Sequence, residues 1–229
     1  MVKYTGPRVR IVRRLGILPG LTKKVSKMRR KSPGEHGKLR FSRAQRPSLA
    51  GDYKERLIEK QKLRYNYGIT ESQLISYYKK AKKEKESTGG LLLKFLESRL
   101  DCIVYRLGFA PTIPSARQLI NHRHILVNNK IVNIPSFLCE KGDTISVKEK
   151  EKSKNLVSVY LETLERKRRL VEGRMKSIQF SKKHNIRTLL PGHLEINADL
   201  LVGKLVKSIK RSNHIMKIKE LKVVEYYSR

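Results

Sequence analysis

Residues 92–108 read LLKFLESRLDCIVYRLG, and this stretch decides the fold class. Its large apolar side chains recur at intervals of three and four residues from Leu92 to Leu107, which is the period of one face of an α-helix. Gly108 follows directly, and glycine often ends a helix because it adopts the left-handed conformation without strain. The spacing predicts one buried helix over residues 92–107.

A second helix and short β-strands are predicted after this one. Thr112 is suited to cap the second helix with its hydroxyl, and Pro114 is tolerated in the first turn. Asn128 and Asn129 lie between two short apolar runs, and asparagine tolerates the positive φ that a tight hairpin needs. A Lys-Gly-Asp turn at residues 141–143 leads into a further strand. Helix, helix, hairpin and strand together predict a compact α+β unit.

Helical patterns also precede this unit. Asp52 is predicted to be the N-cap of a helix that runs to Arg64 and ends at Gly68. Thr70 opens another helix, which continues into a lysine-rich stretch and is predicted to stop at the glycine pair of residues 89–90.

The C-terminal part of the chain combines both patterns. Residues 156–170 predict an amphipathic helix, whereas residues 194–197 and 201–206 alternate in the manner of strands. Residues 218–227 are locally ambiguous. The apolar side of the amphipathic helix is predicted to contain Leu156, Tyr160, Leu161 and Leu164.

The composition points to a polyanionic partner. The chain has 229 residues, of which 53 are Lys or Arg and 20 are Asp or Glu, so its formal net charge is +33. Such a charge repels itself in a compact state and favours a partner such as nucleic acid. No apolar run approaches the ~18 residues of a membrane span, and the N-terminus has no apolar signal core. Two cysteines, Cys102 and Cys139, form no disulfide framework. We therefore expect neither a membrane protein nor a secreted one.

The first fifty residues are predicted to form a basic arm. They contain four prolines and few large apolar side chains, so they cannot bury enough surface to offset the entropy of ordering. We expect the partner to order this segment. Its candidate nucleic-acid ligands are Arg8, Arg10, Arg13, Arg14, Lys23, Lys24, Arg29, Arg30 and Lys31.

The helix after the arm carries a second candidate set. Arg56, Lys60 and Arg64 recur every four residues, so they would form a basic stripe that one side of a helix can lay along phosphates. Lys62 belongs to the same candidate set. Two tyrosines near the helix end, at positions 65 and 67, can either stack on bases or pack the helix end.

A third candidate set lies in the α+β unit. Arg117 and Gln118 project from a helix start, where backbone N–H groups also favour phosphate. Arg99 lies inside the apolar helix beside Asp101 and can equally form an internal ion pair. The full set of candidate ligands in this unit is Arg99, Arg106, Thr112, Ser115, Arg117, Gln118, His122, His124, Asn128 and Lys130.

The sequence contains no catalytic or metal-binding pattern. It lacks the phosphate-cradling nucleotide loop, the zinc pair of the His-Glu-x-x-His type and the nucleophile elbow. His122 and His124 lie two residues apart in a segment expected to be extended, so their rings would point to opposite faces. We expect no metal, no cofactor and no small-molecule substrate, and a protein that is not an enzyme.

Sequence blocks spread over nearly the whole chain carry a family resemblance. The blocks at residues 96–101 (LESRLD), 106–110 (RLGFA), 115–120 (SARQLI) and 132–136 (VNIPS) resemble the RNA-binding domain named after small-subunit ribosomal protein S-four. The flanking blocks at residues 4–8 (YTGPR), 13–16 (RRLG), 59–64 (EKQKLR) and 224–229 (VEYYSR) resemble the ribosomal S-four family itself. Residues 14–22 and 121–128 are similar to its plastid branch.

The resemblance implies a two-domain α+β fold. A helical domain with the basic extended arm would comprise residues 1–90 and would be completed by residues 211–229, whose last segment would be a helix returning to it. The S-four-type RNA-binding domain, with a small and mainly antiparallel sheet, would be inserted over residues 91–210, with its core motif at about 93–155. Residues 23–50 and 155–193 are irregular relative to the family.

The resemblance also implies a function. Family members are structural proteins of the small ribosomal subunit, and they bind its RNA early, near a multi-helix junction, to nucleate assembly. They contact the neighbouring S-five protein at an interface linked to translational accuracy, near the site where messenger RNA enters. The expected location is the plastid (chloroplast stroma), or otherwise a bacterial-type cytoplasm. The alternative function is an S-four-domain RNA chaperone or RNA-modification factor outside the mature ribosome.

Overall fold

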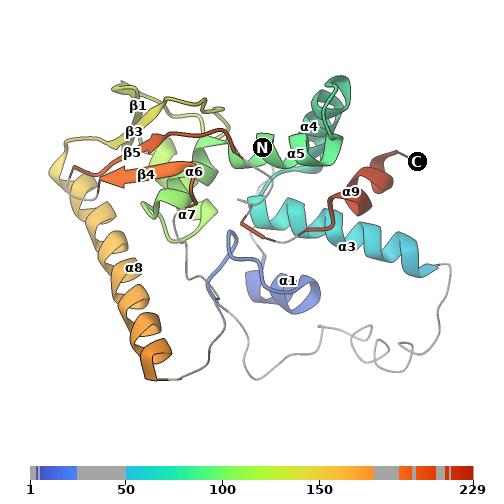
Figure 1. The fold of residues 1–229 in the computed structure, drawn as a ribbon, viewed down its shortest axis with the longest axis horizontal. Coiled ribbons are helices and arrows are strands. Elements are labelled where there is room, and N and C mark those ends of the chain that lie inside the picture. The colour runs from blue at the N-terminus through green and yellow to red at the C-terminus, as the bar shows by residue number, and fades with distance from the viewer. Residues whose placement is uncertain are drawn as a thin grey trace. The chain divides into compact units, whose positions relative to one another are not determined.

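The computed structural model describes residues 4, 6–24, 50–177, 191–197, 200–209, 215–216 and 218–228. The chain folds as two compact units, which are described separately below (Figure 1). The first unit comprises Met1–Leu96 and His214–Arg229, and the second comprises Glu97–Asn213. This division falls near the end of helix α5 (Thr88–Glu97), whereas the domain boundary proposed from the sequence, after residue 90, falls in the first turn of the same helix.

The described part of the first unit consists of helices, and local signals delimit them. They are α1 (Arg8–Leu15), α3 (Ala50–Tyr67), α4 (Glu71–Lys83), most of α5, and α9 (Glu220–Tyr227). Gly68 follows α3 with a φ of 60°. Thr70 and Gln73 form a capping box, in which each side chain accepts the other's backbone N–H. These two boundaries are confirmed, whereas Asp52 lies in the first turn of α3 and is not its cap.

The glycine pair at residues 89–90 does not end α4, as we expected. Helix α4 ends at Lys83, Glu84 is extended, and both glycines lie in the first turn of α5. A Cβ atom on Gly89 would lie 2.9 Å from the Cβ of Glu220 in α9. Glycine is therefore used here for close approach of two helices and not as a stop signal.

Part of the predicted basic arm is folded. Helix α1 buries Ile11, Val12 and Leu15 on one side, and Leu18 and Leu21 in the following turn are buried in the same apolar cluster. The expectation that this whole segment lacks a core is wrong for residues 8–21, because three apolar residues on one helix face and two in the following turn suffice to form a small cluster. Residues 25–49 lie outside the described part of the chain.

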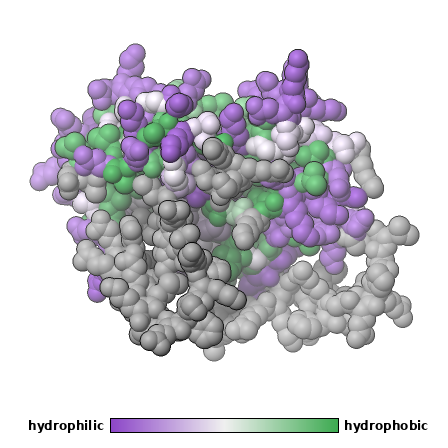
Figure 2. Space-filling view, viewed as in Figure 1, coloured by the Kyte–Doolittle hydropathy of each residue, from purple (hydrophilic) through white to green (hydrophobic). Residues whose placement is uncertain are grey.

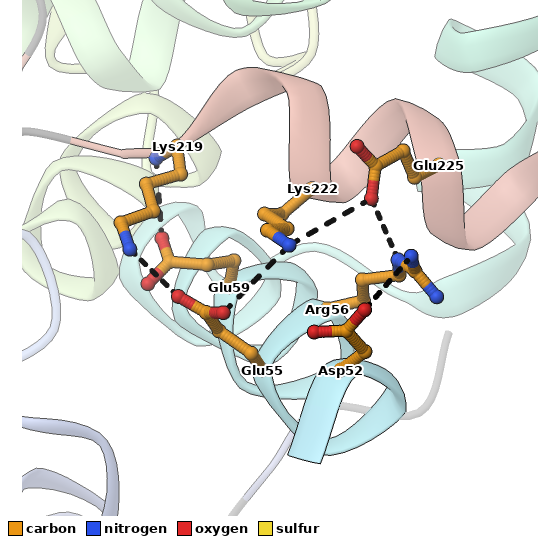
Figure 3. A network of polar contacts seen from close by, with 7 residues as sticks. All are labelled: Asp52, Glu55, Arg56, Glu59, Lys219, Lys222 and Glu225. Carbon is orange, nitrogen blue, oxygen red and sulfur yellow. Dashed lines mark hydrogen bonds and ion pairs between the residues drawn. The ribbon is translucent and has the colours of Figure 1, made fainter. Parts of the chain in front are cut away.

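Helix α9 packs on α3 and confirms the predicted C-terminal helix. Val223 is buried with 1% of its surface exposed. Around it, Lys219 and Lys222 reach Glu55, with Nζ–O distances of 2.6 and 3.7 Å (Figure 3). Glu225, whose carboxylate lies 4.0 Å from Lys222 Nζ, accepts a 2.6 Å hydrogen bond from Arg56 Nε. The last segment of the chain thus completes the first unit by apolar burial and by ion pairs.

The second unit is an α+β fold, as predicted. Its helices are α6 (Leu100–Leu107), α7 (Ile113–Asn121) and α8 (Glu151–Ser177). Its strands are β1 (Ile125–Val127), β2 (Lys130–Ile131), β3 (Thr144–Val147), β4 (Leu194–Asn197) and β5 (Val202–Leu205). The five strands form one antiparallel sheet in the order β2-β1-β3-β5-β4 (Figure 1).

The helix predicted over residues 92–107 is two helices. Helix α5 ends at Glu97, and Arg99 has the extended angles φ −66° and ψ 141° before α6 begins. The N–H of Leu100 donates to the carbonyl of Phe137 at 2.8 Å, and the N–H of Asp101 donates to that of Pro135 at 3.1 Å. These acceptors satisfy the free N–H groups at the start of α6 and stabilise a break that the apolar period does not reveal.

Three predicted turn signals of the second unit are confirmed. Gly108 ends α6 in the left-handed conformation with a φ of 87°. The hydroxyl of Thr112 accepts the N–H of Ser115 at the start of α7. Asn128 and Asn129 have φ angles of 49° and 62°, which match the tight turn of a β1–β2 hairpin.

The core of the second unit lies between α6, α7, α8 and the sheet. Helix α8 contributes Val157, which is fully buried, and Leu161, which packs against the core. Leu156 is 44% exposed, so its predicted place on the buried side is wrong. The helix begins at Glu151, and its buried face includes Ser153 and Val157, which shifts the inward face by one residue.

Gly203 in β5 lies directly against Leu107 of α6, and a Cβ atom there would overlap that leucine side chain. Gly203→Ala should therefore lower the free energy of unfolding by about 1–3 kcal/mol, as overpacking does in other cores. Gly192→Ala is the matched control, because nothing lies within 4 Å of its Cβ position. Urea denaturation measures both. Equal midpoints for the two variants would contradict the packing argument.

Candidate nucleic-acid interface

The exposed polar edge of the second unit lies where α7 leads into β1. Helix α7 ends at Asn121, and Arg123 continues with a φ of 59°. Gln118, His122 and Arg123 are exposed here, and Lys130 is exposed in β2, opposite Val127 at the other end of β1. The left-handed residue turns the chain sharply into the sheet, so the end of α7 and the β1–β2 turn both present polar side chains to solvent.

His122 and His124 lie side by side, which corrects the expectation of opposite faces. Their ring centroids are 6.1 Å apart. The alternation rule does not apply, because His122 caps α7 and Arg123 is left-handed, so the segment is not extended. His124 Nδ1 is 2.8 Å from the hydroxyl of Ser153 in the first turn of α8.

The charge around His124 is positive. Burial lowers its pKa first, and the nearby His122, Lys150 and Lys148 lower it further. Cations that disfavour protonation of an imidazole also favour a bound anion. Arg123, Lys148 and Lys150 were not among the sequence-derived candidates. The sequence did contain a signal for them. Arg123 lies just before the predicted strand β1, and Lys148 and Lys150 lie just after the predicted strand β3, so pairing of these strands would bring them together.

Arg99 and Arg117 are held inward by one buried carboxylate. Arg99 donates from Nε and Nη2 to the two carboxylate oxygens of Asp101 at 3.0 and 2.9 Å. Arg117 Nε donates to Asp101 Oδ2 at 2.7 Å. Asp101 and Arg99 are 1% and 3% exposed. The internal ion pair is therefore the correct alternative for Arg99, and the expectation that Arg117 simply projects outward is wrong, because Asp101 lies beneath it.

Arg106 also faces a carboxylate and not solvent. Its Nε and Nη2 donate to Glu97 at 3.2 and 3.1 Å, and Glu97 is 1% exposed. The thiol of Cys102 donates to the same carboxylate at 3.2 Å. Burial, followed by the charge of Glu97, raises the pKa of Cys102. These hydrogen bonds give Arg106 a structural role within the unit, and its role as an RNA ligand stays a prediction.

Asn128 holds the hairpin to β3. Its Nδ2 donates to Asp143 at 2.8 Å, and its Oδ1 accepts the backbone N–H of Thr144 at 2.9 Å. Thr112 and Ser115 are half-buried at the start of α7, where the threonine hydroxyl serves as the cap. The side chains of Asn128 and Thr112 thus form hydrogen bonds within turns, and their role as RNA ligands stays a prediction.

The predicted basic stripe of α3 is not exposed. Arg56 and Lys60 are 9% and 5% exposed and face α9 and α4. Lys60 Nζ lies 2.8 Å from Glu71 and 4.3 Å from the ring centroid of Tyr226. The prediction of an exposed basic stripe is therefore wrong for Arg56 and Lys60, because α9 covers them.

The remaining α3 candidates differ among themselves. Lys62 pairs with Glu59 at 2.5 Å, and Arg64 is half-buried with its guanidinium carbon 5.4 Å from the ring centroid of Tyr65. Tyr65 packs against the α1 cluster and Tyr67 is buried. The structure therefore favours the packing alternative for both tyrosines.

The arm candidates that the structure describes lie around α1. Arg8, Arg10 and Arg14 are exposed, whereas Arg13 is half-buried. Lys23 and Lys24 are exposed after the turn that follows the helix. The other three arm candidates, Arg29, Arg30 and Lys31, lie outside the described residues.

The described ranges contain neither a cluster of metal ligands nor a helix that could cross a membrane. No group of three or more His, Cys, Asp or Glu side chains there is arranged to hold a metal ion. No helix in these ranges is both long enough and apolar enough to cross a membrane.

Comparisons with known proteins cover the chain from end to end. The family model of the ribosomal protein S4/S9 N-terminal domain matches residues 3–97, and that of the S4 domain matches residues 98–145. Small ribosomal subunit protein uS4c of Cyanophora paradoxa is 48% identical over 229 residues, which is 100% of both chains. Small ribosomal subunit protein uS4 of Trichodesmium erythraeum is 49% identical over 229 residues, which is 100% of this chain and 99% of that one. Because both models match in order and the identity extends over the full length, the chain belongs to the small ribosomal subunit protein uS4 family.

Proposed function

We propose that the chain is a non-enzymatic structural constituent of the small ribosomal subunit that binds small-subunit ribosomal RNA. The observation that carries the proposal is the full-length identity of about half to proteins named for that subunit. The net charge of +33 supports it, because a folded RNA supplies the counter-charge that such a chain needs.

We further propose a primary role in assembly. The protein would bind its RNA early, nucleate the subunit and, with the S-five protein, support translational accuracy near the site where messenger RNA enters. The support is family membership, and the plastid and cyanobacterial relatives favour a plastid ribosome. Order-of-addition reconstitution tests the first claim, and crosslinking to S-five tests the second.

Within the second unit, we propose that the edge around Arg123, His122, Lys130 and Lys150 contacts phosphates. Folded RNA is recognised largely through shape, phosphates and 2′-hydroxyls, so exposed cations beside a turn suffice. The ion-paired arginines would act indirectly, by holding α6 and α7 in place. This assignment keeps His122 and Lys130 from the candidates predicted from the sequence and adds Arg123 and Lys150.

A paired substitution tests this edge. Arg123→Gln with Lys150→Gln should weaken binding to a small-subunit ribosomal RNA fragment at least tenfold, since a charged hydrogen bond contributes about 1.5–3 kcal/mol. Lys204→Gln with Lys207→Gln removes equal charge from other exposed positions of the same unit and should matter less. Equal losses would contradict the assignment of the edge.

Sedimentation tests the function itself. The protein should travel stoichiometrically with small subunits in a sucrose gradient. A chaperone or modification factor would instead be substoichiometric or absent from mature subunits, and that result would overturn the proposal.

Phosphate binding at this edge should raise the pKa of His124. In the free chain, burial and neighbouring cations lower that pKa, and a phosphate would offset the cations. A pKa that is higher in the complex means that binding takes up a proton, so affinity should increase as the pH falls from about 7.5 to 5.5. Histidine NMR titrations with and without RNA measure the shift, and His124→Gln assigns the signal. A pKa that stays the same or falls in the complex would contradict the prediction.

A further inference from the structure

An open groove of about 340 Å³ runs along one side of α4 in the first unit. No candidate residue from the sequence lies in it. Its lining consists of Ser72, Ile75, Ser76, Lys79, Lys80 and Lys83.

The helical repeat places these residues on one side of α4. Ser72, Ser76, Lys80 and Lys83 follow one another at intervals of four, four and three residues, so they form a row along the helix. At 1.5 Å per residue the row is roughly 16 Å long. It begins with two hydroxyl groups and ends with ammonium groups, and all four side chains are exposed.

The lysines of α4 have no carboxylate partner among the described residues, which distinguishes them from several cations of α3 and α9. On α3 and α9, Arg56, Lys60 and Lys219 each have a carboxylate oxygen within 2.8 Å. Lys79, Lys80, Lys82 and Lys83 have no described carboxylate within the 4.0 Å of an ion pair.

The acidic residue of α4 is already engaged elsewhere. Glu71 at its start accepts hydrogen bonds from Lys60 at 2.8 Å and from Tyr227 at 2.7 Å. Burial favours its protonated form, but these two hydrogen bonds lower the pKa of Glu71 overall. The rest of α4 therefore carries uncompensated positive charge, and its outer end is covered by hydrophilic side chains (Figure 2).

The helix dipole accounts for part of this arrangement. Lysines in a last turn interact favourably with the negative end of a helix, and Lys80, Lys82 and Lys83 lie there. The dipole does not account for Lys79 or for the two serine hydroxyls, which continue the polar row toward the opposite end of α4.

We propose that this groove binds the sugar–phosphate backbone of a double-stranded RNA segment; the inference rests on the proposed function. Its lining contains no aromatic ring on which a base could stack and no arginine or amide that could read a base edge. Lysines contact phosphates as point charges, and serine hydroxyls can donate to phosphates or pair with 2′-hydroxyls. Such a surface reads a duplex by its shape and charge.

Charge neutralisation within the full chain tests the groove. Lys79→Gln, Lys80→Gln and Lys83→Gln together should weaken binding to a small-subunit ribosomal RNA fragment by on the order of tenfold or more. They should also reduce the log–log salt slope by roughly 2–3, at about 0.9 per duplex phosphate. The matched control replaces Lys54, Lys82 and Lys85, which are exposed in the same unit but do not line the groove. Equal losses in the two triple variants would overturn the proposal.

Directed cleavage identifies the form of the RNA. The native Cys102 and Cys139 are buried, so an iron chelate would attach selectively to a Ser76→Cys variant. Hydroxyl radicals should then cut both strands of a paired segment. Cuts confined to an unpaired strand would overturn the duplex assignment. If no cuts appear while the unmodified chain still binds the RNA fragment, the proposal that the groove binds RNA is overturned and the proposed function stands. If the unmodified chain does not bind the RNA, the proposed function itself is refuted.

Discussion

Replacing Asp101 by alanine should lower the free energy of unfolding of the second unit by about 3–5 kcal/mol, the range for breaking a buried ion pair. Asp101 is 1% exposed and accepts hydrogen bonds from Arg99 and Arg117. Without this carboxylate, the buried guanidinium of Arg99 loses two charged hydrogen bonds.

Amide hydrogen exchange over residues 100–147 measures the loss, because these peptides report on the second unit alone. Glu149→Ala is the control, since Glu149 is an exposed acidic residue of the same unit. A change below about 1 kcal/mol in the Asp101 variant would mean that its carboxylate stabilises the unit little more than a surface pair does.

Val223→Asp should have a comparable effect on the first unit. Val223 is 1% exposed on α9, which packs on α3, and an aspartate there would be a buried charge in an interface that already holds the acidic side chains of Asp52, Glu55, Glu59 and Glu225 (Figure 3). We expect a loss of about 3–5 kcal/mol, within the range for burying an uncompensated polar group.

Leu221→Asp provides a matched control for this variant. Leu221 lies on the same helix, two positions away, and is 71% exposed. Its replacement should change stability little. Protection of α3 amides from hydrogen exchange measures both variants, and equal effects would show that α9 does not stabilise α3 through the Val223 face.

Features of the fold that depend on neighbouring residues could be predicted from the sequence. The end of α6 at Gly108, the Thr112 cap and the Asn128–Asn129 turn each follow from the backbone preferences of one or two residues. These preferences act within a few residues of chain, so no tertiary contact is needed to recognise them. The amphipathic period likewise predicted apolar helices, although not where one of them breaks.

The break between α5 and α6 could not be predicted in this way. The carbonyls that satisfy the N–H groups of Leu100 and Asp101 come from Pro135 and Phe137, more than thirty residues later. A continuous apolar pattern is compatible with one helix or with two, and the choice depends on whether a distant loop supplies acceptors at the break.

The candidate interface likewise has features that the sequence predicts and features that only the tertiary structure decides. Counting charges predicted a polyanionic partner, because net charge does not depend on the fold. It did not predict which cationic side chains are exposed and able to contact that partner, because the segments that fold against a side chain decide its ion pairs. Arg56 is a stripe residue by spacing, yet its carboxylate partner Glu225 lies 169 residues away in the sequence.

By itself, the amino-acid sequence determined the family, the α+β class, the Gly108, Thr112 and Asn128–Asn129 turn signals of the second unit and the surplus of positive charge. Each of these depends on local conformational preference or on composition. The tertiary structure alone decided that Arg99, Arg106 and Arg117 pair with carboxylates in the second unit and that the lysines of α4 do not pair with described ones. Burial and ion pairing depend on distances in space. The separation of two residues along the chain does not predict that distance, because folding brings distant segments together.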